Sequence, residues 1–135
     1  MNIDDAIAAL EQLEHDVVVA QLAAQRALLA EALSIAHELS SGTWSSAALR
    51  AADHPYARRH GAPRLDPAII NKQTGTFDSY WRIMGSVLIN DSPIAGFLQF
   101  GTSVMFARPI ALEIIARLEL VGQKVAERAV SSVIR

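Results

Sequence analysis

Apolar residues recur at every third or fourth position along the first forty residues of the chain. Residues 2–41 contain neither glycine nor proline, so no helix breaker interrupts this pattern. Asn2 is a candidate N-cap, and Asp4 and Asp5 follow it near the positive end of the helix dipole. The pattern predicts one helix over residues 1–40, of which about 37 residues would reach roughly 55 Å at about 1.5 Å per residue, with Gly42 as its C′ residue. Its apolar positions are Ile3, Ile7, Leu10, Leu13, Val17, Ala20, Ala24, Leu28, Ile35 and Leu39.

A helix of this length exceeds what a domain of 135 residues requires. It can be stabilised by folding back at its alanine-rich middle or by packing against another subunit. The run AALEQLEHDVVVAQLAAQRALLAEAL carries no turn signal, and both arrangements remain open. In either one, we expect the C-terminal half of the helix to pack in the core.

Residues 41–76 form the least regular part of the chain. Prolines and glycines are closely spaced there, which forbids a continuous helix. We expect loops with one short helix at residues 45–52 and a short extended piece near Ile69. A loop of this length in a compact domain is usually functional or disordered.

Residues 77–101 have the alternation that is typical of strands. Between Tyr80 and Asn90, one face would carry Trp81, Ile83, Val87 and Ile89, and the other would carry Arg82, Met84, Ser86, Leu88 and Asn90. The run from Asn90 to Pro93 is a turn signal, and residues 94–100 supply a second strand that ends at Gly101. The pattern predicts an antiparallel hairpin.

The last segment, residues 109–133, returns to helical spacing. Pro109 has the fixed φ that suits the first turn of a helix. The apolar positions are Ile110, Ile114, Leu118, Val121, Val125 and Val130. We therefore expect an α+β fold in a single domain over residues 1–135, with a long helix (1–40), a loop-rich insertion (41–76), a small antiparallel sheet (77–101) and a C-terminal helix (109–133) packed against that sheet.

Charge is nearly balanced overall but unevenly distributed. The chain has 12 basic and 14 acidic residues, so it has no global attraction to nucleic acid or membrane. Residues 1–40 carry seven acidic residues and one basic residue, a net charge of −6, whereas the remainder carries eleven basic and seven acidic residues, a net charge of +4. The two parts can attract each other within one subunit or between neighbours.

Several classes of protein and site lack support in the sequence. There is no cysteine, which excludes disulfides and thiolate metal sites. The N-terminus begins with acidic residues and does not resemble a secretory signal. No run of about 18 residues is free of charged or polar interruptions. We expect a soluble cytoplasmic product, or one assembled from the cytoplasm, with no membrane partner.

Candidate catalytic and metal-binding residues do not form a recognisable pattern. His54 and His60, with Asp53 and Asp66, are the nearest approach to a metal site, but their spacing defines no ligand set. Neither a GxSxG elbow nor a GxxxxGK phosphate loop occurs. We expect no enzymatic activity, no metal and no cofactor.

The segment 50–64 is locally basic. Arg50, Arg58, Arg59 and Arg64 lie close together in sequence, and Tyr56 among them could stack on a base or a guanidinium. A solvated loop, a pairing with the acidic helix and a DNA contact are the open interpretations. In a ring of subunits the same residues would line a channel or a protein contact.

The C-terminal half of the chain carries an ordered set of short motifs: TGTF, a strand with Trp81, LINDSPIAGFLQFGTSVMFARP and a final helix. This order resembles the tail-completion, or head-tail joining, proteins of long-tailed phages and prophages. Gln99 stands where an acidic residue is usual in that family. The matching positions are Thr74, Gly75, Phe77, Asn90, Phe97, Phe100, Gly101, Thr102, Ala107, Arg108 and Pro109.

The resemblance implies a structural protein of the virion neck or tail, assembled in the host cytoplasm. It implies a ring, with six copies around the phage axis, that contacts head connector proteins on one face and tail tube or tail terminator proteins on the other. A minor tail or other neck component is the alternative within the same setting. Our own hypothesis is that Arg58 and Arg59, with Arg64 nearby, face the channel through which DNA passes or contact a partner. The motif residues would mainly shape the fold, since Gly75 and Gly101 permit backbone angles that other residues avoid.

Overall fold

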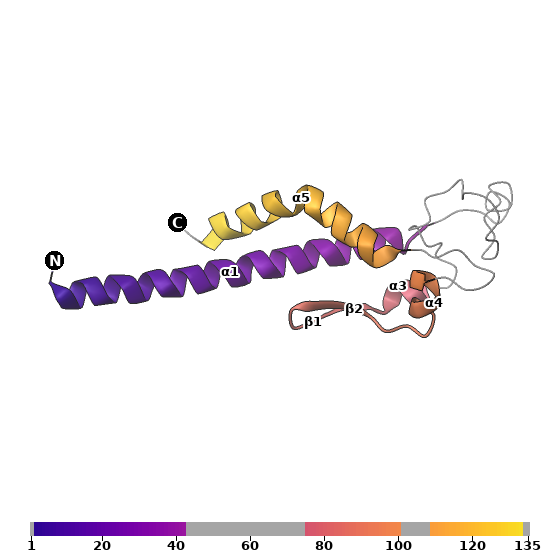
Figure 1. Ribbon diagram of the computed structural model, residues 1–135, viewed down its shortest axis with the longest axis horizontal. Coiled ribbons are helices and arrows are strands. Elements are labelled where there is room, and N and C mark those ends of the chain that lie inside the picture. Colours follow the sequence, from indigo (N-terminus) through magenta and orange to yellow (C-terminus); the bar gives the residue numbers. More distant parts are fainter. Residues whose placement is uncertain (1, 43–74, 101–108, 134–135) are drawn as a thin grey trace.

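The computed structural model describes residues 2–42, 75–100 and 109–133. Its elements follow the order α1 (Ile3–Leu39), α3 (Thr76–Ser79), β1 (Trp81–Met84), β2 (Val87–Asn90), α4 (Ala95–Phe100) and α5 (Ile110–Val133). The fold is α+β and mostly helical, with a two-stranded antiparallel sheet packed against the helices (Figure 1). This confirms the predicted fold class. The predicted short helix at 45–52, the extended piece near Ile69 and the strand end at Gly101 lie outside the described residues.

Helix α1 is a single uninterrupted helix of 37 residues. The side chain of Asn2 accepts a hydrogen bond from the backbone of Asp5, and the Asp5 carboxylate accepts one from the backbone of Asn2, which is a capping box. The helix ends earlier than expected. Ser40 is the C-cap residue and donates its backbone N–H to the carbonyl of Ala36, so the C′ position falls one residue before Gly42. The long helix is confirmed, and the assignment of Gly42 to C′ is wrong.

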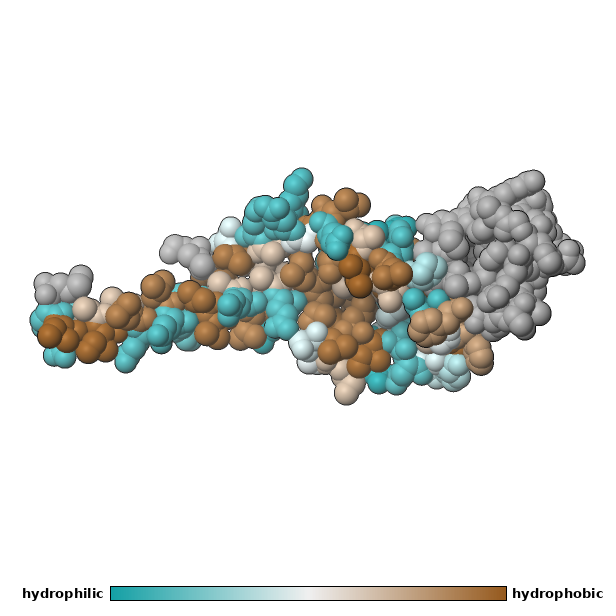
Figure 2. Space-filling model, in the orientation of Figure 1, coloured by the Kyte–Doolittle hydropathy of each residue, from teal (hydrophilic) through white to brown (hydrophobic). Residues whose placement is uncertain are grey.

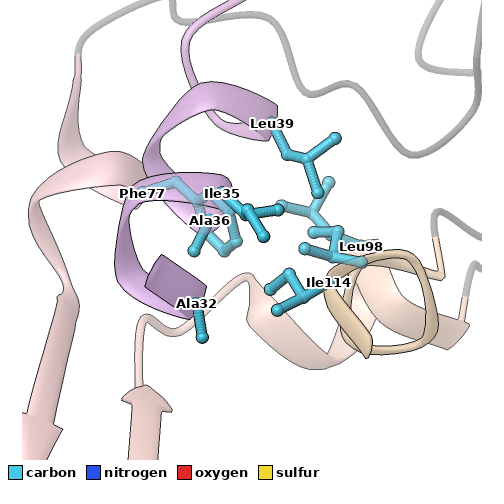
Figure 3. Close-up of a cluster of buried hydrophobic side chains, with 8 residues drawn as sticks. Ala32, Ile35, Ala36, Leu39, Phe77, Leu98 and Ile114 are labelled. Atoms are coloured by element: carbon cyan, nitrogen blue, oxygen red, sulfur yellow. The ribbon is translucent and has the colours of Figure 1, made fainter. Parts of the chain in front are cut away.

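Helix α5 packs along the C-terminal half of α1 and runs in the opposite direction (Figure 1). Their contact continues into a core where α1, α3, α4 and α5 meet (Figure 3). The apolar side chains of this core, which are alanine, leucine, isoleucine and one phenylalanine, come from elements far apart in sequence. Its buried members are Ala32, Ile35, Ala36, Leu39, Phe77, Leu98, Ile110 and Ile114.

The apolar stripe of α5 is close to the expected one. Ile110 and Ile114 are buried, and Leu118, Val125 and Val130 are partly buried. Val121 is 38% exposed, whereas the adjacent Gly122 is buried against α1. A Cβ atom at Gly122 would lie 3.3 Å from Cδ2 of Leu28. The two helices therefore approach closely at a residue that periodicity of large apolar side chains does not identify.

The hairpin is shorter than predicted, and its turn lies elsewhere. Strands β1 and β2 join through Gly85 and Ser86, with Trp81 opposite Asn90 and Met84 opposite Val87. Gly85 has φ of +61°, which suits a tight two-residue turn. Because the chain reverses there, the predicted faces are wrong beyond the turn. Directly opposed residues share a face, so Leu88 and Asn90 lie on the face of Trp81 and Ile83, and Val87 and Ile89 lie on the face of Arg82 and Met84.

Residues 94–100 are not the predicted second strand. They contain helix α4, whose Leu98 is buried in the core. The helix starts after Ser92 and Pro93: Ser92 Oγ accepts a hydrogen bond from the backbone of Ile94, and its carbonyl accepts one from Ala95. A serine followed by proline is a common helix start. Ser92 and Pro93 therefore lie between the end of strand β2 at Asn90 and the start of helix α4 at Ala95.

Candidate interaction surfaces

The N-terminal half of α1 projects beyond the end of α5 and has no partner among the described residues (Figure 1). We call residues 3–18 the arm. Its apolar residues are exposed, with 77% of Ile3, 61% of Leu10 and 59% of Leu13 accessible. The first buried residue of α1 is Ala20. Apolar side chains are visible along the whole projecting length in Figure 2.

The exposed residues of the arm continue the face that is buried further along the same helix. We call Ile3, Ile7, Leu10, Leu13 and Val17 the arm stripe. Seven-residue steps, which are close to two helical turns, connect Ile3, Leu10 and Val17, and the three- and four-residue steps of the stripe continue to the core residues of α1. One apolar face therefore runs the full length of α1 and is covered only in its C-terminal half.

The arm is also strongly acidic. It has no lysine or arginine, and the first basic residue of the chain is Arg26. All of the acidic residues are exposed to solvent, and most lie away from the arm stripe, whereas Glu14 follows Leu10 by four residues and Ile7 by seven and so lies on the same face. The acidic residues of the arm are Asp4, Asp5, Glu11, Glu14 and Asp16.

By length and composition alone, α1 could cross a membrane. It contains an 18-residue window with mean hydropathy 1.3 and at most two charged residues, and 17% of that window is buried. This differs from the expectation that no segment is apolar enough. Core helices and N-terminal signal sequences pass the same criterion, and the C-terminal half of α1 is a core helix here. The criterion is therefore weak evidence for a membrane contact.

Asn90 connects three segments of the predicted motif. Its side-chain Nδ2 donates to the carbonyl of Phe77 at 3.0 Å, and its Oδ1 accepts from the backbone of Ser92 at 3.1 Å. Phe77 is buried and lies edge-on to the ring of Trp81, with 5.8 Å between the ring centroids. Gly75 precedes this segment with φ of +78°, as its predicted role requires. The structure thus joins Phe77 and Asn90 directly and places Gly75 at the N-cap of α3.

Gln99 has a structural role that the sequence did not indicate. Its Oε1 accepts a hydrogen bond from the backbone of Ala111 at 3.2 Å, in the first turn of α5. The first amide groups of a helix have no partner within the helix, so an acceptor there is stabilising. Gln99 therefore does what an acidic side chain would do at this position, and it ties α4 to α5.

Two polar contacts fasten the hairpin region to the end of α1. Nδ1 of His37 lies 2.7 Å from Oδ1 of Asp78, and Nε1 of Trp81 donates to Oγ of Ser40 at 2.7 Å. Each pair is 41 residues apart in sequence, which is why sequence reasoning missed them. No local pattern links such residues before the fold is known.

Arg82 and Asp91 form a bidentate pair on the hairpin surface. Both guanidinium nitrogens, Nη1 and Nη2, lie 2.8 Å from a carboxylate oxygen. The hydrogen bonds from Arg82 lower the pKa of the Asp91 carboxyl below its ordinary value, and the same contact raises the pKa of Arg82. Both groups are exposed, so the pair fixes geometry more than it stabilises the fold.

Helix α4 presents apolar residues to solvent beside a shallow pocket. Phe97 is 59% exposed and Phe100 is 78% exposed, although both belong to the predicted motif. The pocket, of about 420 Å³, lies between the hairpin, α4 and the start of α5, and its lining includes Phe77, Trp81 and Phe100. The two phenylalanines of α4 therefore differ from Phe77, which is a core residue.

The remaining predicted positions divide into two groups. Pro109 is partly buried directly before α5, and its carbonyl accepts from Glu113 at 3.1 Å, as in the first turn of a helix. The other group lies outside the described residues: Thr74, Gly101, Thr102, Ala107, Arg108, Arg58, Arg59 and Arg64, together with His54 and His60. Within residues 2–42, 75–100 and 109–133, no group of three or more metal-ligating side chains is clustered.

Comparison of the chain with protein-family models, with curated protein sequences and with solved structures finds no match. The function must therefore be inferred from the residues and surfaces described above.

Proposed function

We propose that this chain is a structural assembly protein of a phage neck, a tail-completion or head-tail joining component that works by self-association and by binding neighbouring proteins. In this proposal it forms a ring, with six copies around the phage axis, between the head connector and the tail tube or terminator. It acts without catalysis and without a cofactor.

The observation that carries the proposal is the uncovered half of α1. A stripe of large apolar residues that is exposed in an isolated chain marks a binding surface, because such exposure is unfavourable in water. The stripe belongs to a rigid helix whose other half is anchored in the core, so the surface is held out from the body of the protein. A subunit that must contact several neighbours benefits from a surface of this shape.

The order of the motif residues supports the choice of a phage neck. Thr74-Gly75, Phe77, Asn90 and the segment leading to Pro109 resemble tail-completion proteins, and two of these residues, Phe77 and Asn90, are joined by a hydrogen bond. Their roles are local: they position α3, β2 and α4. The surfaces that would contact partners are then the arm and the exposed phenylalanines of α4.

Localisation in the assembled particle tests this proposal. Phage particles produced with a short epitope tag on this chain would be labelled with gold-conjugated antibody and examined by electron microscopy. We expect gold at the junction of head and tail. Label confined to the tail shaft would favour a minor tail component, and particles without label would contradict a structural role in the virion.

A small DNA-binding protein that uses the basic segment 50–64 is the second candidate. It predicts that the free protein shifts duplex DNA in a gel, with an affinity that falls steeply as salt concentration rises. The neck proposal predicts no such binding by the free protein. The two functions therefore separate in one experiment.

A further inference from the structure

We propose that the arm binds the arm of a second copy of this chain, with the two helices antiparallel, in a two-fold symmetric dimer of the free protein. The inference does not rest on the neck function. It follows from the phase of the arm stripe, from the place where α5 ends and from the charges at the two helix ends.

The spacing of the arm stripe selects a helix as its partner. Ile3, Leu10 and Val17 are seven residues apart, and Ala6, Leu13 and Ala20 form a second seven-residue series displaced by three. These are the a and d positions of a helix–helix seam, in which each apolar side chain enters a space between residues of the facing helix. A second copy supplies a helix with the same spacing.

The position of α5 selects the antiparallel orientation. Helix α5 runs antiparallel to α1 on its apolar face and ends over the middle of α1 (Figure 1), and Ala20 is the first buried residue of α1. A second arm laid antiparallel on the first would begin where α5 ends and continue in the same direction. Each arm then covers the stripe of the other, because both uncovered lengths are equal. In a parallel pair, the α5 helices would occupy the space through which the partner's α1 must continue.

The five acidic residues of each arm repel those of the other arm in either orientation, but the charges at the helix ends favour the antiparallel one. The incoming N-terminus carries Asp4 and Asp5, and the last turns of α5 carry Lys124 and Arg128 with one acid, Glu127. These three α5 residues line an open polar hollow at the end of the helix. The positive end of the arm's helix dipole also meets the negative end of the α5 dipole. A parallel pair would instead place the acidic N-termini side by side.

The size of the uncovered stripe is adequate for a pair. Its five side chains are between 47% and 77% exposed. Complete burial of two such stripes would remove on the order of 1,000 Å² from water, which is below the range of stable specific interfaces and typical of a weak, transient one. The dimer is therefore expected to be reversible, and the arm would become available when another partner binds it.

Sedimentation equilibrium of the full chain tests the pairing. We expect a concentration-dependent dimer. Leu10→Asp places a charge at the centre of the seam on both copies and is expected to raise the dissociation constant by about 100-fold or more. Ala8→Asp is the matched control, because it adds the same charge on the opposite, exposed side of the arm. Circular dichroism of both variants establishes that the helices are retained.

Cysteine cross-linking tests the orientation, and the absence of native cysteine makes it specific. Ala6→Cys and Val17→Cys chains would be mixed and oxidised. In an antiparallel seam the a positions of one helix face the d positions of the other, so that Leu10 faces Leu13 of the second copy, and a mixed disulfide is expected between positions 6 and 17. Any of four results would overturn the proposal. These are disulfides only between identical positions, a natural chain that is monomeric, a Leu10→Asp variant that dimerises as well as the natural chain, and a monomer that co-sediments with neutral phosphatidylcholine vesicles.

Discussion

Gly122 provides a quantitative test of the contact between α1 and α5. Alanine is more favourable than glycine in a helix interior by about 1 kcal/mol. Against this gain, the new Cβ would lie 3.3 Å from Cδ2 of Leu28 and 4.0 Å from Cγ of Leu118. Leu28 and Leu118 line an open apolar groove of about 410 Å³, so the Leu28 methyl has room to move by a few tenths of an ångström. Because a few displaced atom contacts are worth about 0.1–0.2 kcal/mol each, Gly122→Ala is expected to stabilise the protein by about 0.5 kcal/mol.

Urea unfolding of matched variants separates the gain in helix propensity from the packing cost of the new methyl group. Ala116→Gly lies on the exposed side of α5 and measures the helix-propensity term in the same helix, with an expected cost of about 1 kcal/mol. The cost of Ala116→Gly minus the gain of Gly122→Ala gives the free energy lost by packing the new methyl group against Leu28 and Leu118. Gly122→Leu cannot be accommodated by a small shift and is expected to destabilise by about 1–3 kcal/mol. A loss of stability of 1 kcal/mol or more in Gly122→Ala would refute the described contact.

Three further changes test other parts of the molecule. Gln99→Ala removes the acceptor from the first turn of α5 and should cost about 1 kcal/mol in urea unfolding, whereas Gln99→Glu should retain stability because it keeps the acceptor and adds charge at the helix N-terminus. The pKa of Asp91 is lowered in the folded state, so its pairing with Arg82 stabilises the fold above the ordinary carboxyl pKa, and this stability is lost as the pH falls through the lowered value. Asp91→Asn should therefore make the free energy of unfolding less dependent on pH on the acid side. Identical pH profiles for the variant and the natural chain would contradict the pairing. Reversal of Arg58 and Arg59 to glutamate should impair DNA retention or head-tail joining, and an unchanged infectious yield would count against a channel role.

The helices at the two ends of the chain could be predicted because their signal is long. Periodicity sustained over 37 and 24 residues outweighs local ambiguity. The exposure of the arm was less predictable, since its stripe has the same composition as the buried half of the helix. What decides between core and surface is the length of α5, which ends near the middle of α1.

The middle of the chain was mispredicted where short signals compete. Gly85-Ser86 is a two-residue turn signal inside an alternating run, and the chain turns there. Residues 90–93 are all turn-forming, which is why the turn is predicted there instead. Ser92-Pro93 then begins α4, although residues 94–100 are apolar enough to suit a strand. In a segment of six or seven residues, burial in the tertiary structure decides between helix and strand. Here the helix buries Leu98 in the core.

The candidate site was only partly accessible to sequence reasoning. Phe77 and Asn90 were identified from motif order, and their shared hydrogen bond gives that order a physical basis. The contacts of His37 with Asp78 and of Trp81 with Ser40 join residues that have no local relation in sequence. They could be found only once α1 and the hairpin were placed beside each other.

If the chain has the proposed function, its gene lies in a phage or prophage, and interruption of the gene there tests the central claim most directly. Lysates would be examined by electron microscopy after induction, with the natural chain supplied from a plasmid as the control. A neck joining protein predicts filled or partly filled heads and finished tails that remain separate, and restoration of joined particles by the plasmid. Normally joined, infectious particles in the absence of the chain would contradict the proposed function.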